Sequence, residues 1–138
     1  SKMFQIGLRA TGYAADDFEW SRRQGATVIS AEECWYQSMA PTMDKIRDII
    51  GPDMPTYLTF DIDGLDPSVA PGTGTPEPGG LTASQGLEII RGCFGLRLVG
   101  CDLMEVSPPY DTSGNTALLA ANLLFEMLCS LPGCIRRR

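Results

Sequence analysis

The sequence of 138 residues contains no histidine, and its five cysteines include no C-x-x-C pair. A zinc site usually combines closely spaced cysteines with histidine, so such a site is not indicated. The cysteines are odd in number and most lie among apolar neighbours, as small buried side chains do. We therefore expect no disulfide framework and favour a reducing compartment for the protein.

Basic charge and long apolar runs are also scarce. The net charge of −6 argues against general nucleic-acid binding, which needs a basic face. The longest apolar stretch, 117–125, is interrupted by Asn122 and is too short to cross a bilayer, so we expect no membrane partner. The opening at Ser1 shows no signal peptide and is more typical of a cut inside a protein. These features favour the cytoplasm, or the mitochondrion if the source is eukaryotic.

Strand-like and helix-like segments alternate along the chain, whose apolar content of 43% suffices for a core. The expected strands are 4–8, 27–29, 57–60 and 96–103. The expected helices are 16–24, 31–36, 41–50, 82–91 and 115–129. This alternation predicts an α/β fold with a mostly parallel sheet flanked by helices, in one domain over residues 1–138.

Local patterns add detail to this prediction. Ser30 and Thr82 each precede Glu or Gln by three residues, which predicts capping boxes at two helix starts. Met43, Ile46 and Ile50 are spaced as the buried stripe of one helix, and Leu87 and Ile90 should face inward from the next. Segment 96–103 is nearly all apolar, so we expect it to be covered on both faces. The last helix, apolar nearly all round, should be largely buried.

The most informative stretch follows the expected strand 57–60. Asp61 and Asp63 are two residues apart, so in extended backbone they would project from the same face. Two carboxylates on one face repel each other unless a cation lies between them, and hard oxygen ligands suit Mg²⁺, Ca²⁺ or Mn²⁺. The alternative is an ordinary turn of Asp, Gly and Pro residues. A long Gly/Pro-rich loop, 70–80, follows, and long ordered loops are usually functional.

Four segments in order, F-D-I-D-G-L-D-P, A-P-G-T-G-T-P-E, G-G-L-T and M-E-V-S-P-P-Y-D, resemble the ureohydrolase family of arginases, agmatinases and guanidino-acid hydrolases. The resemblance extends over 57–131, and G-L-R, T-G-Y and E-E-C-W continue it upstream. It is strongest to the agmatinase and guanidinobutyrase branch. It implies the C-terminal portion of that family's three-layer α-β-α fold.

The resemblance also implies a reaction. In that family two metal ions, normally manganese although another divalent ion such as nickel is possible, support hydrolysis of a guanidinium group with release of urea. Asp61 would bridge both ions and Asp63 would bind one of them. Glu105 would be the catalytic residue that pairs with the substrate guanidinium, and Thr75 would lie close to it. Agmatine or a linear guanidino acid such as 4-guanidinobutyrate is the expected substrate, and the complete enzyme is expected to be a homo-oligomer.

The chain departs from the family in length. Family members are more than twice as long and carry histidine-bearing G-G-D-H and D-x-H-x-D segments that supply further metal ligands. We therefore expect the 138 residues alone to be inactive, and the alternative is a non-catalytic structural or interaction domain. A sheet edge bared by the missing part should favour self-association.

Four further residues have a role that the sequence either assigns or leaves open. Asp66 is expected to fasten the loop rather than to bind metal. Arg9, Tyr13 and Asp17 could contact a substrate tail, but ordinary loop packing explains them equally well.

Overall fold

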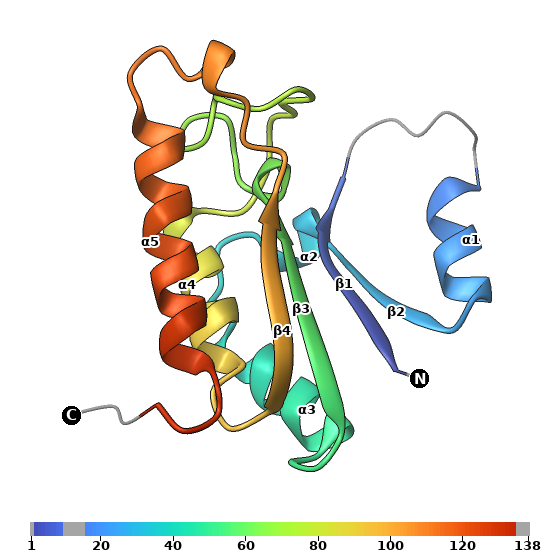
Figure 1. The fold of residues 1–138 in the computed structure, drawn as a ribbon. Helices are drawn as coiled ribbons and strands as arrows, with labels where there is room; N and C mark the ends of the chain where they lie inside the picture. The colour runs from blue at the N-terminus through green and yellow to red at the C-terminus, as the bar shows by residue number, and fades with distance from the viewer. Residues whose placement is uncertain (1, 10–15, 135–138) are drawn as a thin grey trace.

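The computed structural model describes residues 2–9 and 16–134 (Figure 1). Each helix and strand expected from the sequence is present, with ends shifted by at most a few residues. In chain order the elements are β1 (Met3–Leu8), α1 (Asp17–Arg23), β2 (Ala26–Ser30), α2 (Ala31–Cys34), α3 (Ala40–Ile50), β3 (Pro55–Asp61), the 3-10 turn η1 (Ile62–Gly64), α4 (Ala83–Gly92), β4 (Arg97–Met104), the 3-10 turn η2 (Pro108–Tyr110) and α5 (Asn115–Ser130).

The strands form two parallel pairs, β1 with β2 and β3 with β4. The parallel pairing with helical connections confirms the α/β class. Figure 1 shows α1 beside the first pair and α5 beside the second, so both strand pairs lie between these two helices. Within the described ranges, none of the helices has the length and apolar character that a bilayer crossing requires.

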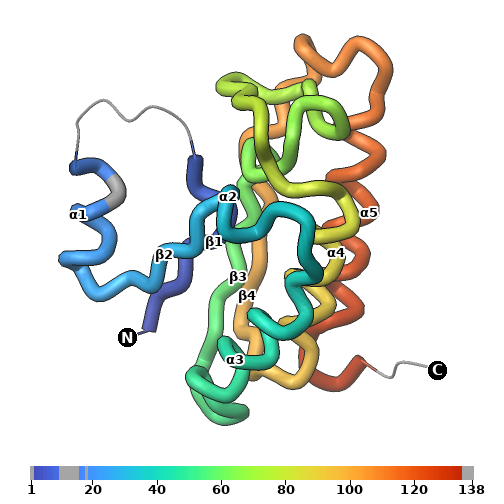
Figure 2. Tube along the Cα trace, turned by 180° about the vertical axis from the view of Figure 1, so that it is seen from behind, coloured from blue at the N-terminus to red at the C-terminus, as the bar shows by residue number. Residues whose placement is uncertain are grey.

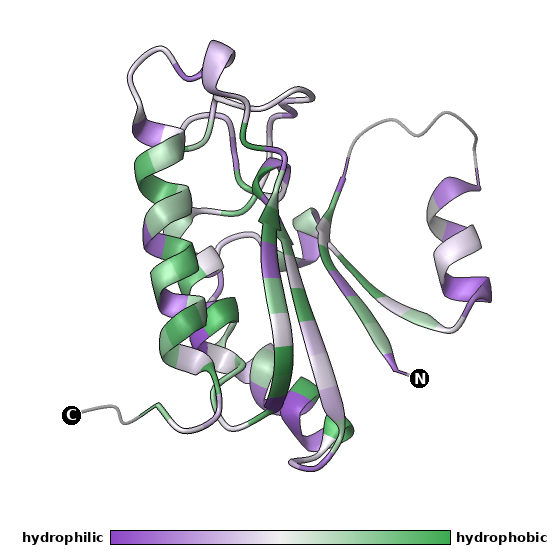
Figure 3. Ribbon diagram, viewed as in Figure 1, coloured by the Kyte–Doolittle hydropathy of each residue, from purple (hydrophilic) through white to green (hydrophobic). Residues whose placement is uncertain are grey.

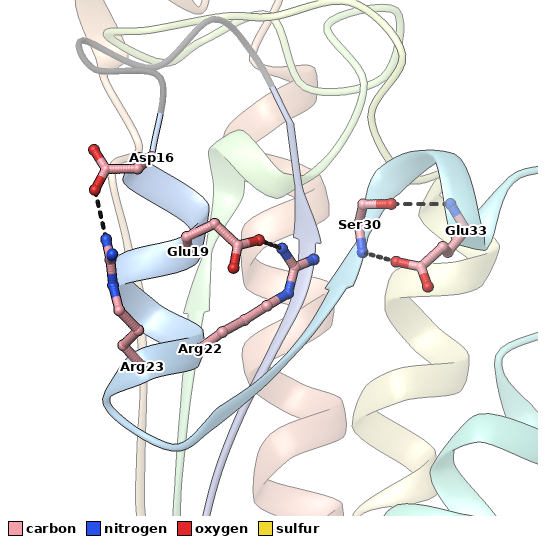
Figure 4. Close-up of polar contacts among 6 residues, drawn as sticks. All are labelled: Asp16, Glu19, Arg22, Arg23, Ser30 and Glu33. Atoms are coloured by element: carbon pink, nitrogen blue, oxygen red, sulfur yellow. Dashed lines mark hydrogen bonds and ion pairs between the residues drawn. The ribbon is translucent and has the colours of Figure 1, made fainter.

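Local sequence signals account for several element ends. The capping boxes predicted at Ser30 and Thr82 are both formed, with reciprocal side-chain and backbone hydrogen bonds. Figure 4 shows the first of these, in which Glu33 accepts from the Ser30 amide at 2.7 Å and its own amide donates to the Ser30 hydroxyl. The same view shows two exposed ion pairs on the neighbouring helix α1, Arg22 with Glu19 and Arg23 with Asp16.

The core lies between α3, α4 and α5 and one face of β3 and β4. Met43 and Ile46 are buried as predicted, whereas Ile50 at the end of α3 is only partly buried. In α4 the buried pair is Ile89 and Ile90, and Leu87 packs at the margin of the core. The prediction that Leu87 and Ile90 face inward is thus confirmed, and Ile89 is buried as well because α4 contacts both α3 and α5.

Two expectations of burial are wrong for the described structure. Helix α5 was expected to be largely buried, yet Leu118, Phe125 and Leu128 are 71%, 62% and 58% exposed. Strand β4 was expected to be covered on both faces, yet Val99 is 62% exposed. Figure 3 shows hydrophobic residues, with hydrophilic ones between them, along the visible side of α5. An apolar sequence predicts that a helix or strand is buried, but it does not say by what. In the described structure only the sides of α5 and β4 that face the core are covered.

Candidate functional site

Two strands end side by side and place acidic residues at the same edge. Asp61 is the last residue of β3 and is paired with Met104, the last residue of β4. Glu105 therefore follows directly beyond the pair. Figures 1 and 2, from opposite sides, show that the loops after β3 and β4 gather at this end of the molecule. Glu105 therefore lies at the same end of the strand pair as Asp61 and Asp63.

The backbone at the aspartates differs from the extended arrangement expected. The chain leaves β3 after Asp61 and enters η1, so Asp63 lies in a 3-10 turn rather than two residues along a strand. Asp61 accepts a hydrogen bond from the Asp63 amide at 2.8 Å, which caps this turn. Because the Asp61 side chain caps this turn, the strand ends at Asp61 and the alternation of side chains does not continue to Asp63.

The three acidic residues line one cleft of about 560 Å³ between the β1 and β3 edges. Asp61, Asp63 and Glu105 all contribute to its wall, together with Arg9. Thr75 is not part of this wall and is exposed, but its hydroxyl donates to Oδ2 of Asp63. The structure therefore brings Thr75 to Asp63.

The carboxylate of Asp63 is only half satisfied. Oδ2 accepts from Thr75, whereas Oδ1 is buried and has no hydrogen-bond partner among the described residues. A buried carboxylate oxygen without a donor or cation is costly, since it has lost its water. This oxygen is suited to a hard cation at the cleft.

Negative charge is in excess beside Asp61. Burial raises the pKa of the Asp61 carboxyl, and the nearby charges of Asp63 and Glu105 raise it further. The Asp63 amide and the charge of Arg9 act in the opposite direction on this pKa. Within residues 2–9 and 16–134, no group of three or more His, Cys, Asp or Glu side chains could hold a metal ion. The chain thus offers two adjacent aspartates as a partial donor set.

Glu105 has an unusual backbone for a residue with a side chain. Its φ of 68° lies in the left-handed region, which favours glycine. Its carbonyl accepts from the buried Thr73 hydroxyl at 3.0 Å, which helps to hold this conformation. Outliers of this kind often accompany functional sites. The exposed carboxylate can accept two parallel hydrogen bonds from a planar cation.

Asp66 fastens the loop, as expected. Its carboxylate accepts from the amides of Ser68, Gly79 and Gly80 at 2.9, 2.8 and 3.2 Å. The hydrogen bonds from Ser68, aided by those from Gly79 and Gly80, lower the pKa of Asp66 to about 2. Because all three donors are backbone groups of the same loop region, Asp66 ties the start of the loop to its end.

The three residues left open have different outcomes. The side chain of Arg9 is engaged by backbone carbonyls of the loops, which favours packing over substrate contact. Tyr13 lies outside the described residues. Asp17 opens α1 and is not part of the cleft wall.

Sequence reasoning missed Gly72 and Thr73. The amide of Gly72 donates to Oγ1 of Thr116 at 2.8 Å, and a Cβ at Gly72 would lie 2.4 Å from Cβ of Asp111. The available signal was the glycine itself, since only a residue without a side chain fits between these two segments. The loop contains many glycines, however, and the sequence does not show which of them makes a close contact.

Comparison with protein families matches residues 1–129 to the arginase family. The guanidinobutyrase of Pseudomonas aeruginosa is 65% identical over 136 residues, 99% of this chain and 42% of that protein. The mitochondrial guanidino acid hydrolase of Homo sapiens is 60% identical over 131 residues, 95% of this chain and 37% of that protein. The chain thus spans about two fifths of the length of these relatives.

Solved structures give the same result. The proclavaminate amidino hydrolase from Streptomyces clavuligerus superposes with a TM-score of 0.84 at 42% identity, over 91% of this chain and 42% of that one. The arginase from Bacillus caldovelox superposes with a TM-score of 0.80 at 27% identity, over 90% of this chain and 42% of that one.

Proposed function

The chain belongs to the arginase family, and we propose that it is the C-terminal part of a longer hydrolase that releases urea from a small guanidino compound. The observation that carries this proposal is the meeting of Asp61, Asp63 and Glu105 in one cleft at the ends of β3 and β4. The names of the relatives favour 4-guanidinobutyrate or a similar linear guanidino acid as substrate, with agmatine as the next candidate.

Asp61 and Asp63 fit the metal that this function requires. Both are hard carboxylate donors, and the unpartnered Oδ1 of Asp63 is a donor without a competing hydrogen bond. We propose manganese, with these two residues as part of its ligand set. The chemistry supplied by two such ions, once bound, is the activation of a water molecule as a nucleophile at neutral pH. The remaining ligands would come from the rest of the longer protein.

Glu105 would orient the substrate. A guanidinium is planar and carries paired N–H donors, so a carboxylate can hold it through two parallel charge-assisted hydrogen bonds. Such a contact fixes the plane of the guanidinium and thereby the face presented to the nucleophile. The bond from Thr73 to the Glu105 carbonyl keeps this carboxylate at the cleft without occupying it.

The 138 residues alone would be inactive under this proposal. Two neighbouring aspartates leave most of the coordination sphere of a second ion unfilled, and the described chain offers no third protein ligand beside them. The alternative function, a structural or interaction domain without catalysis, is favoured by this same incomplete donor set.

Urea release by the complete protein with added Mn²⁺ tests the proposal. The substrate panel is 4-guanidinobutyrate, agmatine and arginine, each assayed with the native protein and with Asp61→Asn and Glu105→Gln. We expect Asp61→Asn to lose at least about 1,000-fold in kcat/KM, equivalent to about 4 kcal/mol of transition-state stabilisation. Glu105→Gln should lose a similar amount because a neutral amide cannot pair with the cation in the same way.

Asp48→Asn is the matched control, since Asp48 is an exposed aspartate on α3 outside the cleft wall. It should retain activity. Absence of urea from every substrate with the complete, metal-loaded protein would favour the structural alternative. Turnover by the isolated 138 residues that disappears in Asp61→Asn would contradict the expected inactivity of this part.

A further inference from the structure

Arg9 follows β1 and reaches across to two loops of the other strand pair. Its guanidinium donates to the backbone carbonyls of Asp63 at 2.8 Å, Leu65 at 3.2 Å and Gly64 at 3.4 Å. Its Nε donates to the carbonyls of Glu77 at 3.0 Å and Pro78 at 3.3 Å. One half-buried side chain thus satisfies five main-chain acceptors.

The backbone carbonyls that Arg9 binds belong to two segments, 63–65 and 77–78, and both segments lie close in sequence to the groups that position the Asp63 carboxylate. Segment 63–65 contains Asp63 itself, and segment 77–78 follows shortly after Thr75, whose hydroxyl donates to Oδ2 of Asp63. Several carbonyl oxygens close together repel one another unless a cation or donors lie between them. Arginine is suited to this place because it carries five donors in a rigid plane and keeps its charge at all relevant pH values.

Asp66 binds the same loop region through the opposite kind of hydrogen bond, since its carboxylate accepts from backbone amides whereas Arg9 donates to backbone carbonyls. Its carboxylate accepts from the amides of Gly79 and Gly80, next to the carbonyls that Arg9 binds. The approach is close, since a Cβ at Gly80 would lie 2.8 Å from Nη2 of Arg9 and 2.5 Å from the amide nitrogen of Asp66. Arg9 and Asp66 therefore hold the stretches 63–66 and 77–80 together, Arg9 through carbonyls and Asp66 through amides.

We propose that Arg9 is a positioning residue for metal binding by Asp63. With its backbone held by Arg9 and its Oδ2 held by Thr75, Asp63 has its second oxygen fixed, buried and without a partner. Arg9 acts through these groups and contacts neither the metal nor the substrate. The inference rests on the proposed function, since it assigns Asp63 as a metal ligand.

The test compares Arg9→Met, Arg9→Lys and Arg97→Met in the complete protein. Arg97 is the matched control because its side chain donates to one backbone carbonyl, that of Asp53 at 3.3 Å, at the opposite end of β4. Calorimetry on the metal-free proteins gives the affinity for Mn²⁺. Hydrogen–deuterium exchange gives the local opening of peptides covering 61–66 and 75–81.

Arg9→Met should weaken Mn²⁺ binding by about 10- to 100-fold, the usual effect of losing a residue that orients a ligand. Exchange should rise in both peptides. At saturating Mn²⁺ the KM for the guanidino substrate should change less than the Mn²⁺ affinity, because Glu105 is held by Thr73 instead. Arg9→Lys should recover part of the Mn²⁺ affinity, since an ammonium keeps the charge but has three donors without the planar arrangement. Arg97→Met should change neither the affinity nor the exchange.

Unchanged Mn²⁺ affinity in Arg9→Met would overturn the inference, and so would full recovery in Arg9→Lys, which would show that charge alone suffices. If Arg9→Met does not fold, the intermediate affinity expected for Arg9→Lys decides the matter. Mn²⁺ binding without urea release would remove the proposed function while the binding and exchange data still test Arg9. Urea release with Mn²⁺ affinity insensitive to Arg9 would remove this inference alone.

Discussion

The loop segment 61–81 and the outer side of α5 are opposites in how they are stabilised. The loop segment has little regular secondary structure. Its two ends are nevertheless held together, because the amide of Asp66 donates to the Leu81 carbonyl and the side chains of Arg9 and Asp66 bind loop backbone. Helix α5 is regular over Asn115–Ser130, yet Leu118, Phe125 and Leu128 are exposed.

This contrast distinguishes a region that is stabilised by contacts within the chain from a surface that has no contacts within it. The loop segment, which bears the candidate ligands, is held in place by hydrogen bonds from within the chain, although Oδ1 of Asp63 has no partner among the described residues. The outer side of α5 is apolar and has no cover among the described residues, as a surface that packs against further protein would. The chain spans about two fifths of the length of its relatives, and under the proposed function the remainder of a longer hydrolase would supply that cover.

The largest expected effect tests the core side of α5 against its outer side. Leu123 is fully buried and Leu118 is 71% exposed on the same helix. Leu123→Ala should lower the free energy of unfolding by about 2–5 kcal/mol through lost burial and a cavity. Leu118→Ala should change it by no more than about 0.5 kcal/mol. Urea denaturation of the 138-residue chain measures both, and equal losses would contradict the assignment of the two sides.

The next effect tests how tightly the loop segment is built. Gly72→Ala places a methyl group 2.4 Å from Cβ of Asp111 and 2.9 Å from Oγ1 of Thr116. We expect a loss of about 1–3 kcal/mol in unfolding free energy, as for other forced overpacking. Gly74→Ala is the control, since a Cβ there would meet nothing within 4 Å. If both variants denature at the same urea concentration, the crossing at Gly72 is looser than the structure indicates.

A smaller effect depends on pH and involves Asp66. Its pKa is lowered from 3.8 to about 2 in the folded chain, so its contribution to stability is complete above about pH 4. As the pH falls from about 4 towards 2 the carboxylate is protonated and the contribution is lost. We expect about 1 kcal/mol, since the side chain remains partly in solvent. Urea titrations at pH 5 and 2.5 should show this loss in the native chain and a smaller one in Asp66→Asn.

The smallest effect on stability concerns the exposed side of α5. Phe125→Lys removes an exposed aromatic ring and should change the unfolding free energy by no more than about 0.5 kcal/mol. Self-association of the 138-residue chain, which the bare apolar side and the open strand edges favour, should decrease. Sedimentation velocity at increasing concentration measures this, and a native chain that stays monomeric throughout would count against the expectation.

Features set by neighbouring residues could be predicted from the sequence. The capping boxes at Ser30 and Thr82 and the strand that ends at Asp61 depend on residues a few positions apart. The arrival of Asp61 and Glu105 at one edge also followed, because parallel strands end on the same side. These inferences needed no knowledge of distant contacts.

Features set by distant contacts could not be predicted. The role of Arg9 depends on carbonyls 54 or more residues away, and the backbone of Glu105 is supported by Thr73, 32 residues earlier. The exposure of α5 depends on which of its faces the other described elements cover. The placement of Asp63 in a 3-10 turn was missed because the alternation of the strand was extended two residues beyond its last residue, Asp61.

The left-handed backbone at Glu105 means that stability and the proposed activity favour different residues at this position. Glycine has no steric penalty at a φ of 68°, so Glu105→Gly would relieve strain even though it deletes the carboxylate. A laboratory selection for heat resistance alone would accept this exchange. Under the proposed function, a selection for growth on a guanidino compound would reject it, so the two experiments would favour opposite substitutions at this position.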